Sequence, residues 1–216
     1  MKILVGVPVY AGIEAETFES LSSMLLFTQR QKRNWQIDIT TTIRTIVWKA
    51  REKIRRKFLR GKYDFLFFAG EDIVFSDDTL IRLISHGLPV ISAMYFDRTK
   101  LHRPYTFYLN SAGQFHYRDP EIFSGLIKVD ATGLDACLIR RDVLEKVPDS
   151  AFRPSFPDVG EDLAFFRYVG QLGFDIFVDA DTQVGHISEQ KKIITIYDHE
   201  KAMRDLPHSD TFSVER

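Results

Sequence analysis

The feature that most constrains the fold is a run of five apolar residues, Phe65 to Ala69, followed after Gly70 by two acids, Glu71 and Asp72. A continuous apolar run of this length is typical of a strand buried on both faces, as in a parallel sheet. In such sheets, ligands bind beyond the carboxyl ends of the strands. Asp72 is therefore expected at the edge of the sheet where ligands bind.

Strands and helices alternate along the first half of the chain. Short apolar runs at 3–7, 35–39, 65–69 and 90–93 predict strands, and apolar residues at helical spacing in 15–30 and 43–58 predict helices between them. Ser76 and Asp77 are expected to cap a further helix. This order predicts an α/β fold with a mostly parallel central sheet flanked by helices.

The second half of the chain is richer in aromatic and turn residues. It predicts a hairpin turn at 110–113, strands at 126–129, 136–139 and 174–178, a loop at 152–160 and a helix at 161–172. After Ser188 the apolar pattern weakens and the chain becomes highly charged. We expect one catalytic domain at 1–188 and a C-terminal extension at 189–216 that packs on it or is partly flexible.

Composition excludes several classes of protein. The formal net charge is −1 over 216 residues, which gives no overall attraction to nucleic acid or to anionic membranes. The basic run at 49–62 is interpreted as a solvated helix face. No apolar run approaches the ~18 residues of a membrane-spanning helix. Cys137 is the single cysteine, which fits a reducing compartment, so we expect a cytoplasmic protein without a nucleic-acid partner or a transmembrane segment.

Four segments, at 5–10, 67–74, 129–141 and 160–186, together resemble glycosyltransferases of the GT-A fold. The resemblance is to the large family-two-like group of bacteria, archaea and their viruses, and it covers about residues 2–188. It implies an enzyme of the hexosyltransferase type. Such an enzyme moves a sugar from a nucleotide-sugar donor, a UDP- or GDP-sugar, to a hydroxyl acceptor on a glycan, protein or lipid.

The resemblance also implies a metal site. The Asp-x-Asp motif of the family corresponds to Gly70-Glu71-Asp72, so Asp72 would bind the metal, and His186 matches a late histidine of the family. Gly70 replaces the first Asp and removes one carboxylate. One carboxylate and one imidazole suit Mn²⁺ better than Mg²⁺. For Glu71, a metal ligand and a solvated loop acid remain equal alternatives.

The donor and the acceptor are expected to contact different segments. The residues expected at the donor are Pro8, Val9, Tyr10, Asp38, Arg51, Gly70 and Glu71. The pair Glu161-Asp162 begins a predicted helix, where acids are also favoured by the helix dipole alone. The resemblance places the general base in this pair, and we assign Asp162 as the base and Glu161 as an acceptor-binding or structural residue. An inverting mechanism is presumed.

Two other functions remain open from the sequence. The missing first Asp is compatible with a non-catalytic relative that binds a nucleotide or glycan without turnover. A nucleotidyltransferase would use a similar sheet with acids at the strand ends, and it would release pyrophosphate instead of a nucleoside diphosphate.

Overall fold

The computed structural model describes residues 1–121, 123–154 and 160–205. The strands of its main sheet are β1 (Lys2–Val9), β2 (Gln36–Ile43), β3 (Phe65–Ala69), β5 (Val90–Met94), β8 (Leu126–Val129), β10 (Ala136–Arg140) and β11 (Ile176–Gln183). They form one seven-stranded sheet in the order β2-β1-β3-β10-β5-β11-β8. β10 and β8 run against the other five strands. The predicted α/β fold with a mostly parallel sheet is confirmed.

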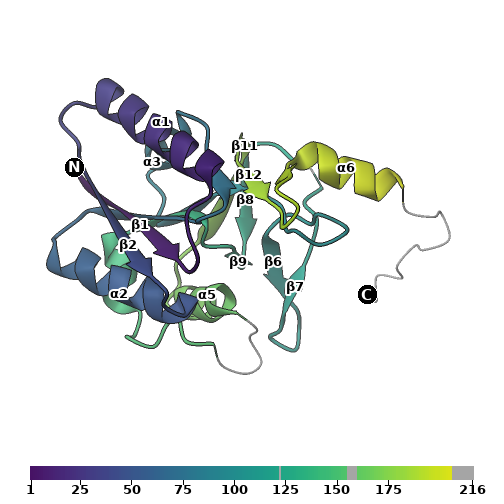
Figure 1. Cartoon of the computed structure of the whole chain (residues 1–216). Helices are drawn as coiled ribbons and strands as arrows, with labels where there is room; N and C mark the ends of the chain where they lie inside the picture. Colours follow the sequence, from purple (N-terminus) through teal and green to yellow (C-terminus); the bar gives the residue numbers. More distant parts are fainter. Residues whose placement is uncertain (122, 155–159, 206–216) are drawn as a thin grey trace.

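Helices cover both faces of this sheet (Figure 1). The helices are α1 (Ala15–Gln31), α2 (Val47–Arg60), α3 (Thr79–Ser85), α4 (Arg141–Lys146) and α5 (Glu161–Gln171). Neighbouring residues of β3 point to opposite faces, so Phe67 packs in the cluster with residues of α1 and α3, whereas Phe68 packs with residues of α2, α4 and α5. The continuous apolar run of β3 therefore reflects burial on both sides, as predicted.

Two small sheets complete the molecule. One has the order β13-β12-β4 and consists of β4 (Ile73–Val74), β12 (Gly185–Ile187) and β13 (Ile193–Ile194). The other has the order β7-β6-β9 and consists of β6 (Thr106–Leu109), β7 (Phe115–Tyr117) and β9 (Ala131–Thr132). The predicted turn at 110–113 is confirmed, because the N–H of Gly113 donates to the carbonyl of Asn110 and Gly113 has a φ of 72°.

The last described helix is α6 (Ile196–Arg204), which follows β13. The ring of His199 stacks on Phe96 with centroids 5.4 Å apart, and Lys191 pairs with Glu14. The described part of the predicted extension therefore contacts the preceding residues, whereas 206–216 lie outside the described residues, as do 155–159 of the predicted loop.

Among the described residues, no helix is long and apolar enough to cross a membrane.

Two predicted strand ends are wrong. β1 was expected to end before Pro8, but it continues to Val9. Proline is tolerated there because β3 pairs with β1 only as far as Gly6, so no ladder bond needs the missing N–H. β2 runs to Ile43 instead of residue 39, and α2 begins only at Val47.

The predicted cap of α3 is also wrong. The residue before the helix is Asp78, and no side chain caps its first turn. Asp77 instead accepts a hydrogen bond from Ser23 at 2.6 Å, which links this segment to α1. Ser76 contributes only its carbonyl oxygen, to the N–H of Thr79.

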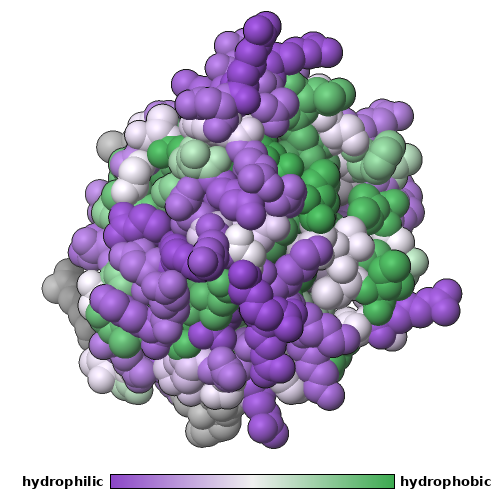
Figure 2. Space-filling view, turned by 90° about the vertical axis from the view of Figure 1, so that its left-hand side faces the viewer, coloured by the Kyte–Doolittle hydropathy of each residue, from purple (hydrophilic) through white to green (hydrophobic). Residues whose placement is uncertain are grey.

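The basic run on α2 is only partly a solvated face. Arg51 and Arg55 are buried, and Arg55 donates to the carbonyl oxygens of Leu144 and Val147 at 2.9 and 2.7 Å. The exposed members of the run at 49–62 are Lys49, Lys53, Arg56, Lys57, Arg60 and Lys62. Seen from the left-hand side of Figure 1, the surface is mostly hydrophilic with separate hydrophobic areas (Figure 2).

Phe165 holds α5 against the sheet and provides a test of the core. It is fully buried and stacks on Phe152 with centroids 4.7 Å apart. We expect Phe165→Ala to lower the free energy of unfolding by about 3–5 kcal/mol, measured by urea denaturation. Phe18→Ala is the control, because Phe18 is 63% exposed, and it should change little. Equal effects of the two substitutions would contradict this packing.

Candidate active site

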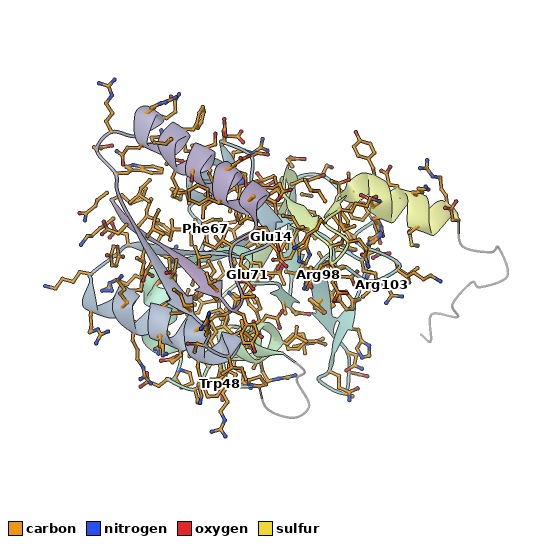
Figure 3. The ribbon with its side chains drawn as sticks, viewed as in Figure 1. Glu14, Trp48, Phe67, Glu71, Arg98 and Arg103 are labelled. Carbon is orange, nitrogen blue, oxygen red and sulfur yellow. The ribbon has the colours of Figure 1, made fainter. Side chains whose placement is uncertain are left out.

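The carboxyl ends of the parallel strands gather the polar residues of the candidate site. Tyr10 follows β1, and Glu71 and Asp72 follow β3. β10 runs antiparallel to β3 with Ala136 opposite Ala69, so residue 135 arrives at the same edge. Figure 3 shows Glu71 and Arg98 near the centre of the molecule, beside Glu14.

Asp72 and His186 meet because β4 pairs with β12. The N–H of Ile187 donates to the carbonyl of Asp72 at 2.8 Å, and the Oδ2 atom of Asp72 lies 3.5 Å from Nε2 of His186. Burial alone would raise the pKa of Asp72, but His186 and Arg98 outweigh burial and lower it below its ordinary value. Asp72 is therefore an ionised carboxylate.

The tautomer of His186 follows from its other ring nitrogen. Nδ1 lies 2.7 Å from the carbonyl oxygen of Phe96, which can only accept, so Nδ1 carries the hydrogen. Without a metal, Nε2–H faces Oδ2 of Asp72; a bound metal would replace this hydrogen, so that the Nε2 lone pair and Oδ2 would face the metal together, as is usual for a metal-binding histidine. Two ligands of a metal at about 2.1 Å are about 3.0–3.4 Å apart, which is close to the distance between these atoms.

This pair fits a divalent ion as two of its ligands. In 1–121, 123–154 and 160–205, no group of three or more His, Cys, Asp or Glu residues is placed to hold a metal. The other ligands would have to be oxygen atoms of a substrate or water. Imidazole nitrogen and carboxylate oxygen are both common ligands of divalent metal ions in proteins.

Arg98 lies on a loop directly over the pair. Asp97 holds this loop, because its Oδ1 atom accepts hydrogen bonds from the N–H groups of Thr99 and Arg103. Nη1 of Arg98 donates to Oδ2 of Asp72 at 2.8 Å, and the Arg98 side chain is 46% exposed. Arg98 therefore uses the same oxygen atom that a metal would use, and it is free to turn toward solvent.

Glu71 holds the loop that follows β1. Its Oε2 atom accepts the N–H of Tyr10 at 2.8 Å, and its carbonyl oxygen accepts the N–H of Glu14 at 3.0 Å. Burial raises the pKa of the Glu71 carboxyl above its ordinary value. The Tyr10 ring is 69% exposed, whereas Pro8 and Val9 belong to β1 itself. These contacts favour a role for Glu71 in positioning the loop over a role as metal ligand.

Arg51 is buried and joins two acids from distant parts of the chain. It donates to Oδ1 of Asp135 at 2.7 Å, to Oε1 of Glu161 at 3.0 Å and to the carbonyl oxygen of Leu134 at 3.3 Å. Burial alone would lower the pKa of Arg51, but Asp135 and Glu161 outweigh it and raise the pKa. The guanidinium therefore faces the acids of the site, and it is 2% exposed.

Asp162 lies beside Glu161 in the first turn of α5. Burial, followed by the negative charge of Glu161, raises the pKa of Asp162 to about 7. Its Oδ1 atom accepts the N–H of Leu163 at 2.8 Å, and among the described residues Oδ2 accepts no hydrogen bond and can take a proton. A carboxyl group with this pKa is suited to general-base catalysis near neutral pH.

Two tyrosine rings pack against His186. Tyr95 and Tyr105 stack with centroids 4.6 Å apart, and Tyr105 lies 6.3 Å from the His186 ring. Burial, and then Asp135, raise the pKa of Tyr105, and the charge of Asp162 is a further cause. Tyr105 therefore packs beside His186 of the Asp72–His186 pair, and the charge of Asp162 affects its pKa.

Asp38 does not join the other predicted donor residues. Asp38 lies opposite Leu4 in the pairing of β2 with β1. It is five residues, or about 16 Å, away from the carboxyl end of β2. Its Oδ2 atom accepts a hydrogen bond from the Tyr63 hydroxyl at 2.8 Å. The other predicted positions lie at or next to the carboxyl-end edge, or contact its acids.

The sequence left open whether the basic loop at 98–103 binds the diphosphate or an acidic acceptor and whether Asp135 binds sugar hydroxyls, and it gave Tyr95 no role. The basic loop at 98–103 was a signal for Arg98. The signal for Asp135 was Gly70 itself, because a motif that lacks one carboxylate suggests a replacement from another segment. Nothing in the sequence distinguished Tyr95 from other buried aromatic residues.

Comparisons with solved structures support this architecture. A crystal structure of protein A197 from STIV matches with 22% identity and a TM-score of 0.60, over 90% of this chain and 94% of that one. A glycosyltransferase involved in glycosylation of the major capsid protein of PBCV-1 matches with 10% identity and a TM-score of 0.51, over 94% of this chain and 100% of that one. The chain has a GT-A-like fold. No family model and no curated protein matches the sequence.

Arg51 provides a test of how the site is held together. Arg51→Met leaves Asp135 and Glu161 without their shared cation, so we expect the free energy of unfolding to fall by about 3 kcal/mol. Urea denaturation at neutral pH measures this change. Arg56→Met is the matched control on the same helix, because the Arg56 side chain is 57% exposed, and it should change stability little. A stable Arg51→Met protein would show that the cluster is not required.

Proposed function

We propose that this protein is a glycosyltransferase that moves a sugar from a UDP- or GDP-sugar to a hydroxyl acceptor. One observation carries the proposal. The Asp72–His186 pair follows β3 at the carboxyl-end edge of the sheet, and Arg51 joins Asp135 at the same edge to the first turn of α5, which carries the near-neutral carboxyl of Asp162. Such a site can stabilise a leaving diphosphate on one side and accept a proton on the other.

On the donor side, Asp72 and His186 would hold a divalent ion. When bound, such an ion neutralises the negative charge that develops on the departing diphosphate. Arg98 would leave Asp72 and pair with a phosphate oxygen, since a guanidinium binds phosphate and carboxylate in similar geometry. Glu71 would keep the loop at Tyr10 in place against the nucleotide base.

On the acceptor side, Asp162 would take the proton from the attacking hydroxyl group. The hydroxyl oxygen forms a bond to the anomeric carbon while the bond from that carbon to the phosphate oxygen breaks, and the nucleoside diphosphate leaves. Tyr105 and Tyr117, with centroids 6.4 Å apart, would contact the sugar rings. This direct displacement inverts the anomeric carbon.

A non-catalytic binding protein is the second candidate. Gly70 lacks the carboxylate of the motif, and Arg98 pairs with the one that remains, both of which favour ligand binding without turnover. The two candidates differ in release of a nucleoside diphosphate. A nucleotidyltransferase would release pyrophosphate from a nucleoside triphosphate.

The pH dependence of transfer tests the base. Asp162 acts when deprotonated, so kcat/KM should rise about tenfold per pH unit below pH 7 and level off above it. Glu161→Gln removes a neighbouring negative charge and should shift this rise to lower pH. Asp162→Asn should abolish transfer while nucleotide binding persists. If Asp162→Asn retains normal turnover, or the rise lies near pH 4, Asp162 is not the base.

Thermal unfolding tests the metal. At a hundredfold excess over Kd, UDP or GDP should raise the Tm by about 5–10 °C when Mn²⁺ is present. This shift should vanish in Asp72→Ala and His186→Ala. Asp77→Ala is the matched control, because Asp77 is an exposed acid five residues beyond Asp72, and it should retain the shift. An equal shift without Mn²⁺ would contradict the metal role and assign the phosphates to basic side chains.

A further inference from the structure

Gly70 has no room for a side chain. A Cβ atom at this position would lie 2.8 Å from Cβ of Asp135, 3.0 Å from Cγ of Asp135 and 3.0 Å from Cγ1 of Ile73. The N–H of Gly70 also donates to the carbonyl oxygen of Asp135 at 2.8 Å, so the two backbones are held together. Asp135 therefore fills the space that an aspartate at position 70 would need.

Asp135 is held in this place by rigid surroundings. Its N–H donates to the hydroxyl of Tyr95 at 3.2 Å, and the Tyr95 ring is 1% exposed. A Cβ atom at Gly133 would lie 1.7 Å from the same hydroxyl oxygen, so this segment packs directly on Tyr95. The next residue, Ala136, begins β10 opposite Ala69 of β3. The position of Asp135 next to Gly70 is thus fixed by strand pairing and by packing.

The carboxylate of Asp135 has unused capacity to accept hydrogen bonds. Oδ1 accepts from Arg51 at 2.7 Å, and the side chain is 30% exposed. An ionised carboxylate offers about four lone-pair sites. Within the described part of the chain, Asp135 does not form a three-residue metal group with Asp72 and His186. The chemistry left to it is the binding of hydroxyl or N–H groups at the edge of the sheet.

We propose that Asp135 supplies the carboxylate that Gly70 lacks, and that it binds hydroxyl groups of the nucleotide-sugar donor. This role rests on the proposed function, because it names a residue that holds the donor of that reaction. The hydroxyls belong either to the ribose or to the transferred sugar, and both present the same chemistry to a carboxylate. In this arrangement the motif is completed by a residue 65 positions later in the chain.

Binding of UDP, UDP-glucose, GDP and GDP-mannose, measured by calorimetry with Mn²⁺, tests the proposal. Asp135→Asn keeps an oxygen for Arg51 and removes the charge, and it should weaken donor binding by about 10- to 100-fold. Weaker binding of the diphosphates and of the sugar nucleotides alike would place the contact on the ribose. Weaker binding of the sugar nucleotides alone would place it on the transferred sugar.

An exchange of the two residues gives a sharper test. Gly70→Asp alone should weaken binding and lower stability, because its side chain meets Asp135. Combined with Asp135→Gly, it places the carboxylate back in the freed space. The double variant should therefore bind the donor more tightly than either single variant does, which is a coupling that independent sites do not show. Asp142→Asn removes another Asp–Arg pair, with Arg140, and should bind as the wild type does.

Three outcomes would overturn the role of Asp135. If the wild type binds donor and Asp135→Asn binds it equally well, the role is wrong and the proposed function stands. The same holds if the folded double variant binds no better than the single variants. If the wild type binds none of the four nucleotides, the proposed function fails, and the role of Asp135 fails with it.

Discussion

The buried guanidinium of Arg51 is the interaction on which the candidate site depends. It connects α2 to the residues before β10 and to the first turn of α5, because Asp135 and Glu161 both bind it. A cation that is 2% exposed is costly without such partners. Any packing of α5 that moved Glu161 away would leave Nε of Arg51 without its carboxylate partner. The Arg51–Glu161 pair therefore favours one position for the start of α5 over the sheet. This also fixes the position of Asp162, the next residue of the helix.

The acids of the edge differ because their surroundings differ. Asp72 lies beside His186 and Arg98, which lower its pKa, whereas the pKa of Glu71 is raised by burial. Asp162 has a pKa of about 7, because burial and Glu161 act in the same direction. One edge thus presents an ionised carboxylate and a carboxyl group that can exchange a proton near neutral pH. Unequal environments of this kind give chemically similar side chains different roles.

Much of the fold could be predicted because apolar periodicity reports burial directly. The run at 65–69 predicted a strand buried on both faces and placed Asp72 just beyond its carboxyl end, and both are confirmed. For Asp38, apolar periodicity gives the wrong position. The prediction ended the second strand at residue 39, which put Asp38 near the edge where ligands bind. β2 continues to Ile43, so this edge lies several residues beyond Asp38. A strand end is set by pairing with a neighbour, and pairing is not visible in local sequence.

The charged cluster could not be predicted for a related reason. The apolar stripe of α2 indicates which side faces the sheet, and the resemblance placed Arg51 at the donor, but nothing in the local sequence shows that Arg51 is buried against two acids. Its partners follow 84 and 110 residues later, and only the tertiary structure brings them together. Gly70 is the one local clue, because a glycine where a related motif has a carboxylate leaves room for another segment.

The pairing of β4 with β12 has a consequence for the timing of assembly. β1, β2 and β3 lie within the first 69 residues, whereas His186 follows Asp72 by 114 residues. At about 5–20 residues per second of synthesis, the imidazole leaves the ribosome about 6–23 seconds after the carboxylate. The closure of such a long loop must also be compensated by packing, which favours its formation late in folding. A growing chain therefore exposes the acids of the edge well before it can form the Asp72–His186 pair, and that pair marks a nearly completed fold.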